Sequence, residues 1–171
     1  MKRVLIAGIG NIFFGDDAFG CEVVSELSGR NLPAEVCIND FGIRGYDLAC
    51  ALTKEYEGVI LVDAVPRGQP PGTVYLIEPD REELQRLAPA TPDAHSLDPV
   101  SVLQLAESLG GFNGKLFLVG CEPAVLETDD GTMGLSEPVR QAVPRAIEMI
   151  ESVLRDSFEL TTMTTAGLVP V

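Results

Sequence analysis

The chain has 171 residues, 46% of them hydrophobic, and its 12 basic and 26 acidic residues give a net charge of −14. This length and composition fit one compact domain with a full core. So negative a surface excludes nucleic acids and anionic membranes as expected partners, and no apolar run approaches the roughly 18 residues of a membrane span.

Apolar periodicity and turn signals predict an alternation of strands and helices along the chain. In chain order, the predicted elements are a strand over 4–7, a helix over 16–27, a strand over 35–39, a helix over 46–56, strands over 58–62 and 73–77, a short polar helix over 79–87, a helix over 99–109, a strand over 115–120 and a helix over 136–155.

This alternation predicts a three-layer α/β/α sandwich with a mostly parallel five-stranded sheet. The gap from Asp63 to Thr73 is short for a helical crossover, so the strand over 73–77 is expected to be an antiparallel edge strand. We expect a single domain over 1–157 and a C-terminal tail over 158–171 that lacks helical periodicity.

The four cysteines lack CxxC spacing and lie in apolar surroundings, which predicts buried free thiols in a reducing compartment rather than a metal–thiolate site. The N-terminus enters a predicted strand directly and shows no pattern of a cleavable signal. We therefore expect a cytoplasmic protein.

Three side chains from separate segments are candidates for chemistry: Asp17, Asp63 and His95. Asp17 and Asp63 each follow a buried strand, so both should emerge at the carboxyl edge of the sheet, where such folds build their sites. His95, the only histidine, lies in the irregular stretch before the helix over 99–109. If it returns to that edge, the set fits a divalent first-row metal or acid–base catalysis.

Each member of this set also has a structural interpretation. Asp16 or Asp17 suits a helix cap, Asp63 suits a turn, and a lone histidine is usually a solvated loop residue. Nucleotide binding at the glycine-rich turn is disfavoured, because the third glycine of the fingerprint is missing and two acids would repel a pyrophosphate. Cys121 as a nucleophile would require His95 as its base, so a packed turn residue is the favoured interpretation.

Five blocks of the sequence, in order and at similar spacing, resemble the hydrogenase maturation endopeptidases over residues 3 to about 155. The blocks are Gly8-Ile9-Gly10-Asn11 with Asp16-Asp17-Ala18-Phe19-Gly20, then Asp40-x-Gly42-x-x-Gly45, then Leu61-Val62-Asp63-Ala64-Val65 with Pro71-Gly72-Thr73, then His95-Ser96-Leu97, and finally Val119-Gly120-Cys121-Glu122-Pro123.

The resemblance implies a cytoplasmic endopeptidase of the aspartic type, monomeric when free. Its implied substrate is the precursor of a nickel–iron hydrogenase large subunit, whose C-terminal extension it removes after nickel insertion. In the family, acids at the positions of Asp17 and Asp63 and the histidine at the position of His95 bind a metal. They are thought to recognise nickel carried by the substrate, so no resident catalytic metal is expected.

The chain departs from the family in its second block, which usually reads Asp-Gly-Gly-Thr. Here Phe41 replaces a glycine able to take a positive φ, and Ile43 removes a hydroxyl, so we expect these departures to affect substrate choice or cleavage efficiency. Asp16 is a further candidate for the role of Asp17. Two other functions stay open: a non-catalytic nickel-dependent chaperone of hydrogenase assembly and a small-ligand-binding Rossmann-like domain.

Overall fold

The computed structural model describes residues 3–80, 99–126, 131 and 133–161, and within them five strands form one sheet in the order β2-β1-β3-β5-β4. The strands are β1 (Val4–Ile9), β2 (Val36–Gly42), β3 (Gly58–Ala64), β4 (Val74–Ile77) and β5 (Lys115–Cys121). The helices are the 3-10 helix η1 (Gly15–Ala18) and the α-helices α1 (Phe19–Ser28), α2 (Gly45–Leu52), α4 (Pro99–Ser108) and α5 (Glu137–Phe158).

The two most apolar strands take the centre of the sheet. Every residue of β1 and β3 is buried, since both faces of these strands are covered, whereas the edge strands β2 and β4 are largely half-buried or exposed. Neighbouring strands pair in parallel except for β4, which runs antiparallel to β5. The predicted mostly parallel sheet with an antiparallel edge strand is confirmed.

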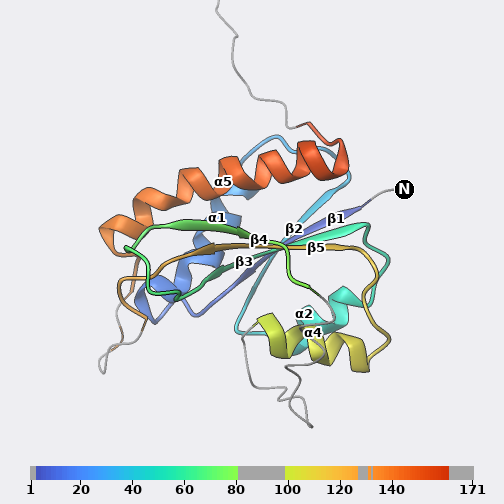
Figure 1. The fold of residues 1–171 in the computed structure, drawn as a ribbon, viewed down its shortest axis with the longest axis horizontal. Coiled ribbons are helices and arrows are strands. Elements are labelled where there is room, and N and C mark those ends of the chain that lie inside the picture. Colours follow the sequence, from blue (N-terminus) through green and yellow to red (C-terminus); the bar gives the residue numbers. More distant parts are fainter. Residues whose placement is uncertain (1–2, 81–98, 127–130, 132, 162–171) are drawn as a thin grey trace, which may run out of the picture.

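Helices cover both faces of this sheet, which makes the predicted three layers (Figure 1). Helices α1 and α5 bury their apolar sides against one face of the sheet and form one core with it. Helices α2 and α4 pack on the opposite face in a second core. None of the helices in the described ranges is both long and apolar enough to cross a bilayer.

The first helix begins later than its sequence pattern predicts. The predicted start at Asp16 falls inside η1, and α1 begins only at Phe19, without a side-chain cap on either helix. The reason is that Asp16 bonds to Ala124 and Ser136, more than 100 positions further along the chain, rather than to the turn that follows it. Its predicted role as a helix cap is therefore wrong, and so is that of Asp17, whose carboxylate bonds back to Asn11.

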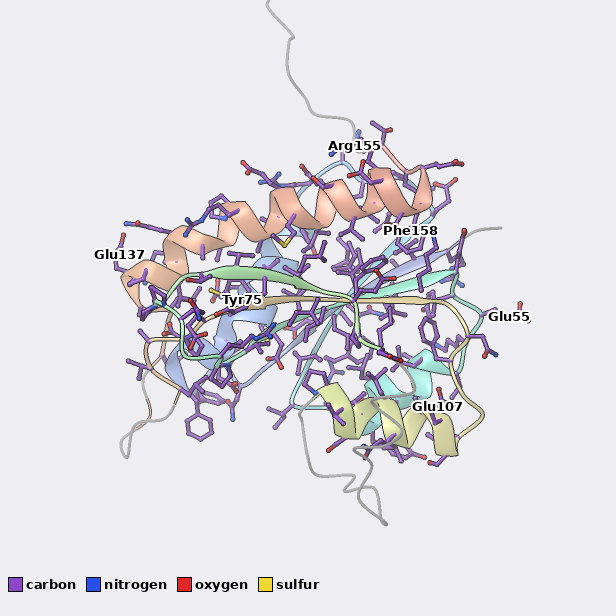
Figure 2. All side chains as sticks on the ribbon, in the orientation of Figure 1. Glu55, Tyr75, Glu107, Glu137, Arg155 and Phe158 are labelled. Carbon is purple, nitrogen blue, oxygen red and sulfur yellow. The ribbon has the colours of Figure 1, made fainter. Side chains whose placement is uncertain are left out.

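Two other helices end at different residues from those predicted. Helix α2 ends at Leu52 rather than Tyr56, because the chain already turns toward β3 through the bond from the main-chain N–H of Lys54 to the carbonyl of Ala51. Helix α5 continues past Arg155 to Phe158, whose ring is buried at 6.0 Å from the ring of Phe117 (Figure 2).

Several predictions fall outside the described residues: His95, most of the helix over 79–87 and most of the tail. The cysteines are only partly as expected. All four are free, and Cys21 and Cys121 are buried, but Cys37 and Cys50 are half-buried. Cys37 lies at the surface because β2 is an edge strand, and its sulfur accepts a hydrogen bond from the guanidinium of Arg3 at 3.1 Å.

Candidate active site

The carboxyl ends of β1 and β3 bring Asp17 and Asp63 to one edge of the sheet, as predicted. Asp63 is the penultimate residue of β3, and Asp17 lies in η1, on the connection that leaves β1. Gly10 makes this approach feasible: its φ is +136°, and a Cβ there would lie 1.7 Å from the carbonyl oxygen of Asp17. Any larger residue at position 10 would push Asp17 away from the sheet.

Gly20 holds the start of α1 against the same edge. A Cβ at this position would lie 2.1 Å from the carbonyl oxygen of Val62 and 2.3 Å from that of Ile9. The helix therefore packs directly on the ends of both central strands. Glycines on either side of Asp17 thus fix how far its backbone stands from β1 and β3.

Asp17 and Asp63 line one cavity of about 430 Å³. The other residues of its wall are Ile9, Gly10, Ala64, Val65, Pro66, Pro99, Val100 and Leu118. These are apolar or glycine residues, so among the described residues of this wall the two carboxylates are the charged groups. Such a pocket, with acidic groups against an apolar lining, attracts a cation or a polarised peptide group.

Main-chain N–H groups orient both carboxylates. Oδ2 of Asp17 accepts a hydrogen bond from the N–H of Asn11 at 2.7 Å, and Oδ1 of Asp63 accepts one from the N–H of Ala64 at 2.8 Å. A carboxylate held by a backbone donor keeps its direction without a flexible partner. Both acids are therefore preorganised at the cavity wall.

Cys21 lies close to these acids but stays a neutral thiol. Burial, with the nearby carboxylates of Asp40, Asp17 and Asp63, raises the pKa of Cys21 to about 12. Its Sγ lies 3.5 Å from the carbonyl oxygen of Gly10, to which it donates. A thiol in this state is a packing group rather than a nucleophile.

Asp16, the sequence neighbour of Asp17, has a different environment. It is completely buried, and Oδ2 accepts from the N–H of Ala124 at 2.8 Å and of Val125 at 2.9 Å. Ser136 donates its N–H to Oδ1 at 2.7 Å and its hydroxyl to Oδ2 at 2.9 Å. Asp16 thus joins η1 to the exit of β5 and the start of α5, and the structure does not support an exchange of roles with Asp17.

Glu122, which sequence reasoning did not single out, organises the loop after Asp63. Its buried carboxylate accepts from the N–H of Arg67 at 2.8 Å, of Gly68 at 3.1 Å and from the hydroxyl of Tyr75 at 2.5 Å. The bond from Tyr75, with the main-chain N–H groups of residues 67–69, outweighs the effect of burial and lowers the pKa of Glu122. Its position after the apolar strand β5 indicates only that it lies at the carboxyl ends of the strands, since its backbone partners are about 55 positions earlier in the chain.

The pKa values of two neighbours of Glu122, Tyr75 and Cys121, are raised, so both side chains stay protonated at neutral pH. Partial burial and the bond to Glu122 raise the pKa of Tyr75 to about 12. Burial, with the neighbouring carboxylate of Asp16, also raises the pKa of Cys121 to about 12. Cys121 is therefore a packed residue at the end of β5, as favoured from the sequence.

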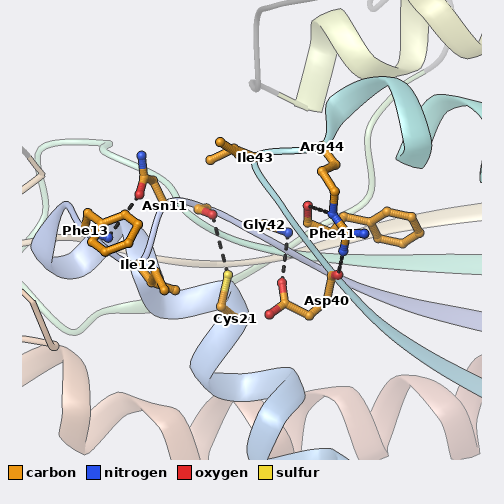
Figure 3. A pocket seen from close by; sticks show the side chains of 10 residues that line it. Asn11, Ile12, Phe13, Cys21, Asp40, Phe41, Gly42, Ile43 and Arg44 are labelled. Carbon is orange, nitrogen blue, oxygen red and sulfur yellow. Dashed lines mark hydrogen bonds between the residues drawn. The ribbon is translucent and has the colours of Figure 1, made fainter.

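A second hollow of about 300 Å³ lies beside the cavity of the two acids, and Gly10 contributes to both (Figure 3). Ile12 and Phe13 from the connection after β1 lie on one side, and Asp40 and Ile43 from the end of β2 lie on the other. Oδ1 of Asp40 accepts from the N–H of Gly42 at 2.8 Å.

The second-block departures are accommodated at this hollow. Phe41 needs no positive φ, because Gly42 takes it instead at +53°, and the ring of Phe41 is buried in the core under α2. Ile43, in contrast, is exposed. Both departures line this hollow, but only Ile43 adds a largely exposed apolar side chain to the surface.

The structure thus brings together two of the three predicted site residues. His95 lies outside the described residues, although Pro99, four positions later in the sequence, lines the cavity. Within the described ranges, no group of three or more His, Cys, Asp or Glu side chains is arranged to hold a metal ion. A metal ion bound by two carboxylates would keep open coordination positions, which ligands from other groups could fill.

Comparison with known proteins gives one consistent family. The model of the hydrogenase maturation proteases matches residues 21–153, a range that includes Asp63 but begins after Asp17. The hydrogenase 2 maturation protease of Escherichia coli is 33% identical over 157 residues, which cover 91% of this chain and 92% of that protein.

Solved structures agree with this comparison. The hydrogenase maturating endopeptidase HybD of Escherichia coli superimposes with a TM-score of 0.78 at 31% identity, covering 95% of this chain and 97% of that one. The hydrogenase 2 maturation peptidase of a Thaumarchaeota archaeon is 35% identical, with a TM-score of 0.66 and coverage of 90% and 98%.

Proposed function

The chain belongs to the hydrogenase maturation protease family, and on that premise we propose that it removes the C-terminal extension of a nickel–iron hydrogenase large-subunit precursor after nickel insertion. The observation that carries the proposal is the single cavity lined by both Asp17 and Asp63. Two carboxylates with open coordination positions suit a divalent nickel ion that arrives with the substrate.

Nickel acts in this proposal as a checkpoint carried by the precursor, and the protease has no resident catalytic metal. Without nickel, the substrate brings no cation to two carboxylates that repel each other across one cavity. After insertion, the precursor presents a positive centre to them. Productive binding therefore requires a loaded substrate.

His95 is the proposed third contact with nickel. Its neutral imidazole suits that borderline metal, and the position of Pro99 in the cavity wall supports a role for the segment that precedes it. The three proposed site residues are thus Asp17, Asp63 and His95. They form both the metal-recognition set and the catalytic set.

The proposed reaction is hydrolysis of one peptide bond. A carboxylate takes a proton from water, the water oxygen bonds to the carbonyl carbon, the C–N bond breaks, and the proton passes to the leaving amine. This route makes the enzyme an aspartic-type endopeptidase, and polarisation of the water by substrate nickel is the competing route. We place the reaction in the cytoplasm, with a free enzyme that is monomeric.

The test uses the large-subunit precursors encoded in the same genome, each prepared with and without nickel. The wild-type protein should shorten a nickel-loaded precursor, seen on a gel and located by mass spectrometry, while the nickel-free form stays intact. Asp63→Asn should lower the rate about a thousandfold, within the range for loss of an acid–base group. Asp156→Asn, which changes an exposed acid at the end of α5, is the matched control.

Three outcomes would contradict parts of the proposal. An intact precursor that binds the protein only with nickel would indicate the assembly chaperone instead. Equal cleavage with and without nickel would remove the checkpoint. Unchanged processing by Asp17→Ala, Asp63→Ala and His95→Ala would remove the assigned site.

A further inference from the structure

We propose that the exposed apolar side chains around the second hollow are the docking surface for the precursor, and that they take a segment carrying a large apolar side chain. This surface, called here the rim patch, consists of Ile12, Phe13 and Ile43. The inference rests on the proposed function, because it names the part of the substrate that lies next to the two-acid cavity.

The rim patch consists of large apolar side chains that are exposed to solvent. The side chains of Ile12, Phe13 and Ile43 are 45%, 58% and 56% exposed, although each is as apolar as the residues that fill the two cores. They come from two segments, the connection after β1 and the end of β2, and gather at one hollow (Figure 3). Clustered exposed apolar side chains of this kind mark interaction sites.

The rim patch is tied directly to the proposed catalytic cavity. Gly10 lines both hollows, and the next residue, Asn11, donates its N–H to Oδ2 of Asp17 at 2.7 Å. A chain seated on Ile12 and Phe13 therefore lies next to the cavity of Asp17 and Asp63. Continuity between the two hollows is what an extended polypeptide substrate needs.

The connection that carries the rim patch is fixed before any partner arrives. Oδ1 of Asn11 accepts from the N–H of Phe13 at 3.0 Å, and the carbonyl of Asn11 accepts from the N–H of Phe14 at 3.1 Å. With the bond to Asp17, three hydrogen bonds hold this turn. A preorganised surface loses little conformational entropy on binding.

The chemistry of the hollow selects its occupant. A volume of about 300 Å³ with walls of Ile12, Phe13 and Phe41 accommodates a large apolar side chain. Asp40 and Arg44, which also line the hollow, carry opposite charges, so it is the net charge of −14 of the chain that disfavours an acidic segment. A second copy of this chain fits poorly, because each copy carries a net charge of −14 and self-association would bring these charges together. The occupant is therefore a precursor segment with an apolar side chain and neutral or basic neighbours.

The experiment compares Ile12→Ser/Phe13→Ser with Leu76→Ser, a control that removes an equally exposed apolar side chain (47%) from the edge strand β4. Steady-state cleavage of the nickel-loaded precursor is measured for each full-length protein, together with the melting temperature. We expect KM to rise about tenfold or more in the double variant, as for loss of an interface anchor, with kcat within about twofold of wild type. Leu76→Ser should match wild type.

The outcomes separate this inference from the proposed function. If the wild-type protein cleaves the precursor and the double variant keeps its KM, or if Leu76→Ser raises KM equally, the docking proposal fails while the proposed function stands. If the wild type cleaves no precursor, the proposed function fails, and equal binding of the nickel-loaded precursor to both proteins then overturns the docking proposal as well. A wild-type dimer that the double variant turns into a monomer would assign the rim patch to self-association and overturn it.

Discussion

The amino ends and the carboxyl ends of the parallel strands are surrounded by different kinds of side chains. At the amino ends of the strands, Phe158 packs its ring against Gly58, where a Cβ would lie 2.0 Å from the ring, and against Phe117. Lys115 covers this edge by donating from Nζ to the carbonyl of Ser157 at 2.9 Å. Apolar packing and surface contacts of Lys115 close this end of the strands.

The carboxyl ends of the same strands collect buried charge instead. Asp16, Asp63 and Glu122 are all buried there, and main-chain N–H groups donate to each of them. Two hollows open at this edge and share Gly10. This chain thus places its stabilising packing at one end of β3 and its acids at the other, about 16 Å away at 3.3 Å per residue.

The largest expected effect on stability is at the amino edge. Phe158→Ala empties a buried aromatic site between α5 and the sheet, so the free energy of unfolding should fall by about 4 kcal/mol. Urea denaturation measures this loss. Phe158→Leu, which keeps most of the volume, should lose much less, and the cleavage rate per folded molecule should match wild type in both. A lost cleavage rate in folded Phe158→Leu would show that the two edges are not independent.

A smaller loss is expected at the carboxyl edge from Asp16→Asn. The asparagine keeps one oxygen but must turn its NH₂ group toward at least one N–H of Ala124, Val125 or Ser136, which leaves a buried donor unsatisfied. The expected cost is about 2 kcal/mol, measured by urea denaturation. Asp156→Asn, at an exposed acid, is the control and should stay within about 0.5 kcal/mol of wild type. Equal stabilities would show that Asp16 does not hold the segment over 124–136.

The sheet and the positions of Asp17 and Asp63 could be predicted from the sequence, because both follow from local sequence pattern. The apolar runs that become β1 and β3 identify the central strands, and an acid after each such run must emerge at the carboxyl edge. Asp17 and Asp63 were found in this way. His95 stays a prediction, because it lies outside the described residues.

The roles of Asp16 and Glu122 were not predictable from local pattern. The partners of Asp16 lie more than 100 positions further along the chain, and those of Glu122 are backbone N–H groups about 55 positions earlier, so neither acid shows its role in its own neighbourhood. The rim patch was missed for a different reason. Its residues are as apolar as core residues, and only their placement in the connections that leave β1 and β2 exposes them.

The smallest expected effect concerns pH and the loop that follows Asp63. The pKa of Glu122 is lower in the folded than in the unfolded chain, so its contribution to stability is present above the ordinary glutamate pKa of about 4.3 and is lost as the pH falls through the lowered value.

In Glu122→Gln, this part of the pH dependence should disappear. Melting temperatures from pH 7 down to pH 3 should therefore fall less steeply in the variant than in wild type, whereas Glu148→Gln on the exposed side of α5 should follow wild type. The buried glutamine can still accept from Gly68, Tyr75 can reverse its hydroxyl, and only the N–H of Arg67 loses its acceptor, so the loop should remain folded at pH 7. An identical slope in wild type and Glu122→Gln would mean that this carboxylate does not supply the charge that holds residues 67–69, and the carboxyl edge would then depend on Asp16 more than on Glu122.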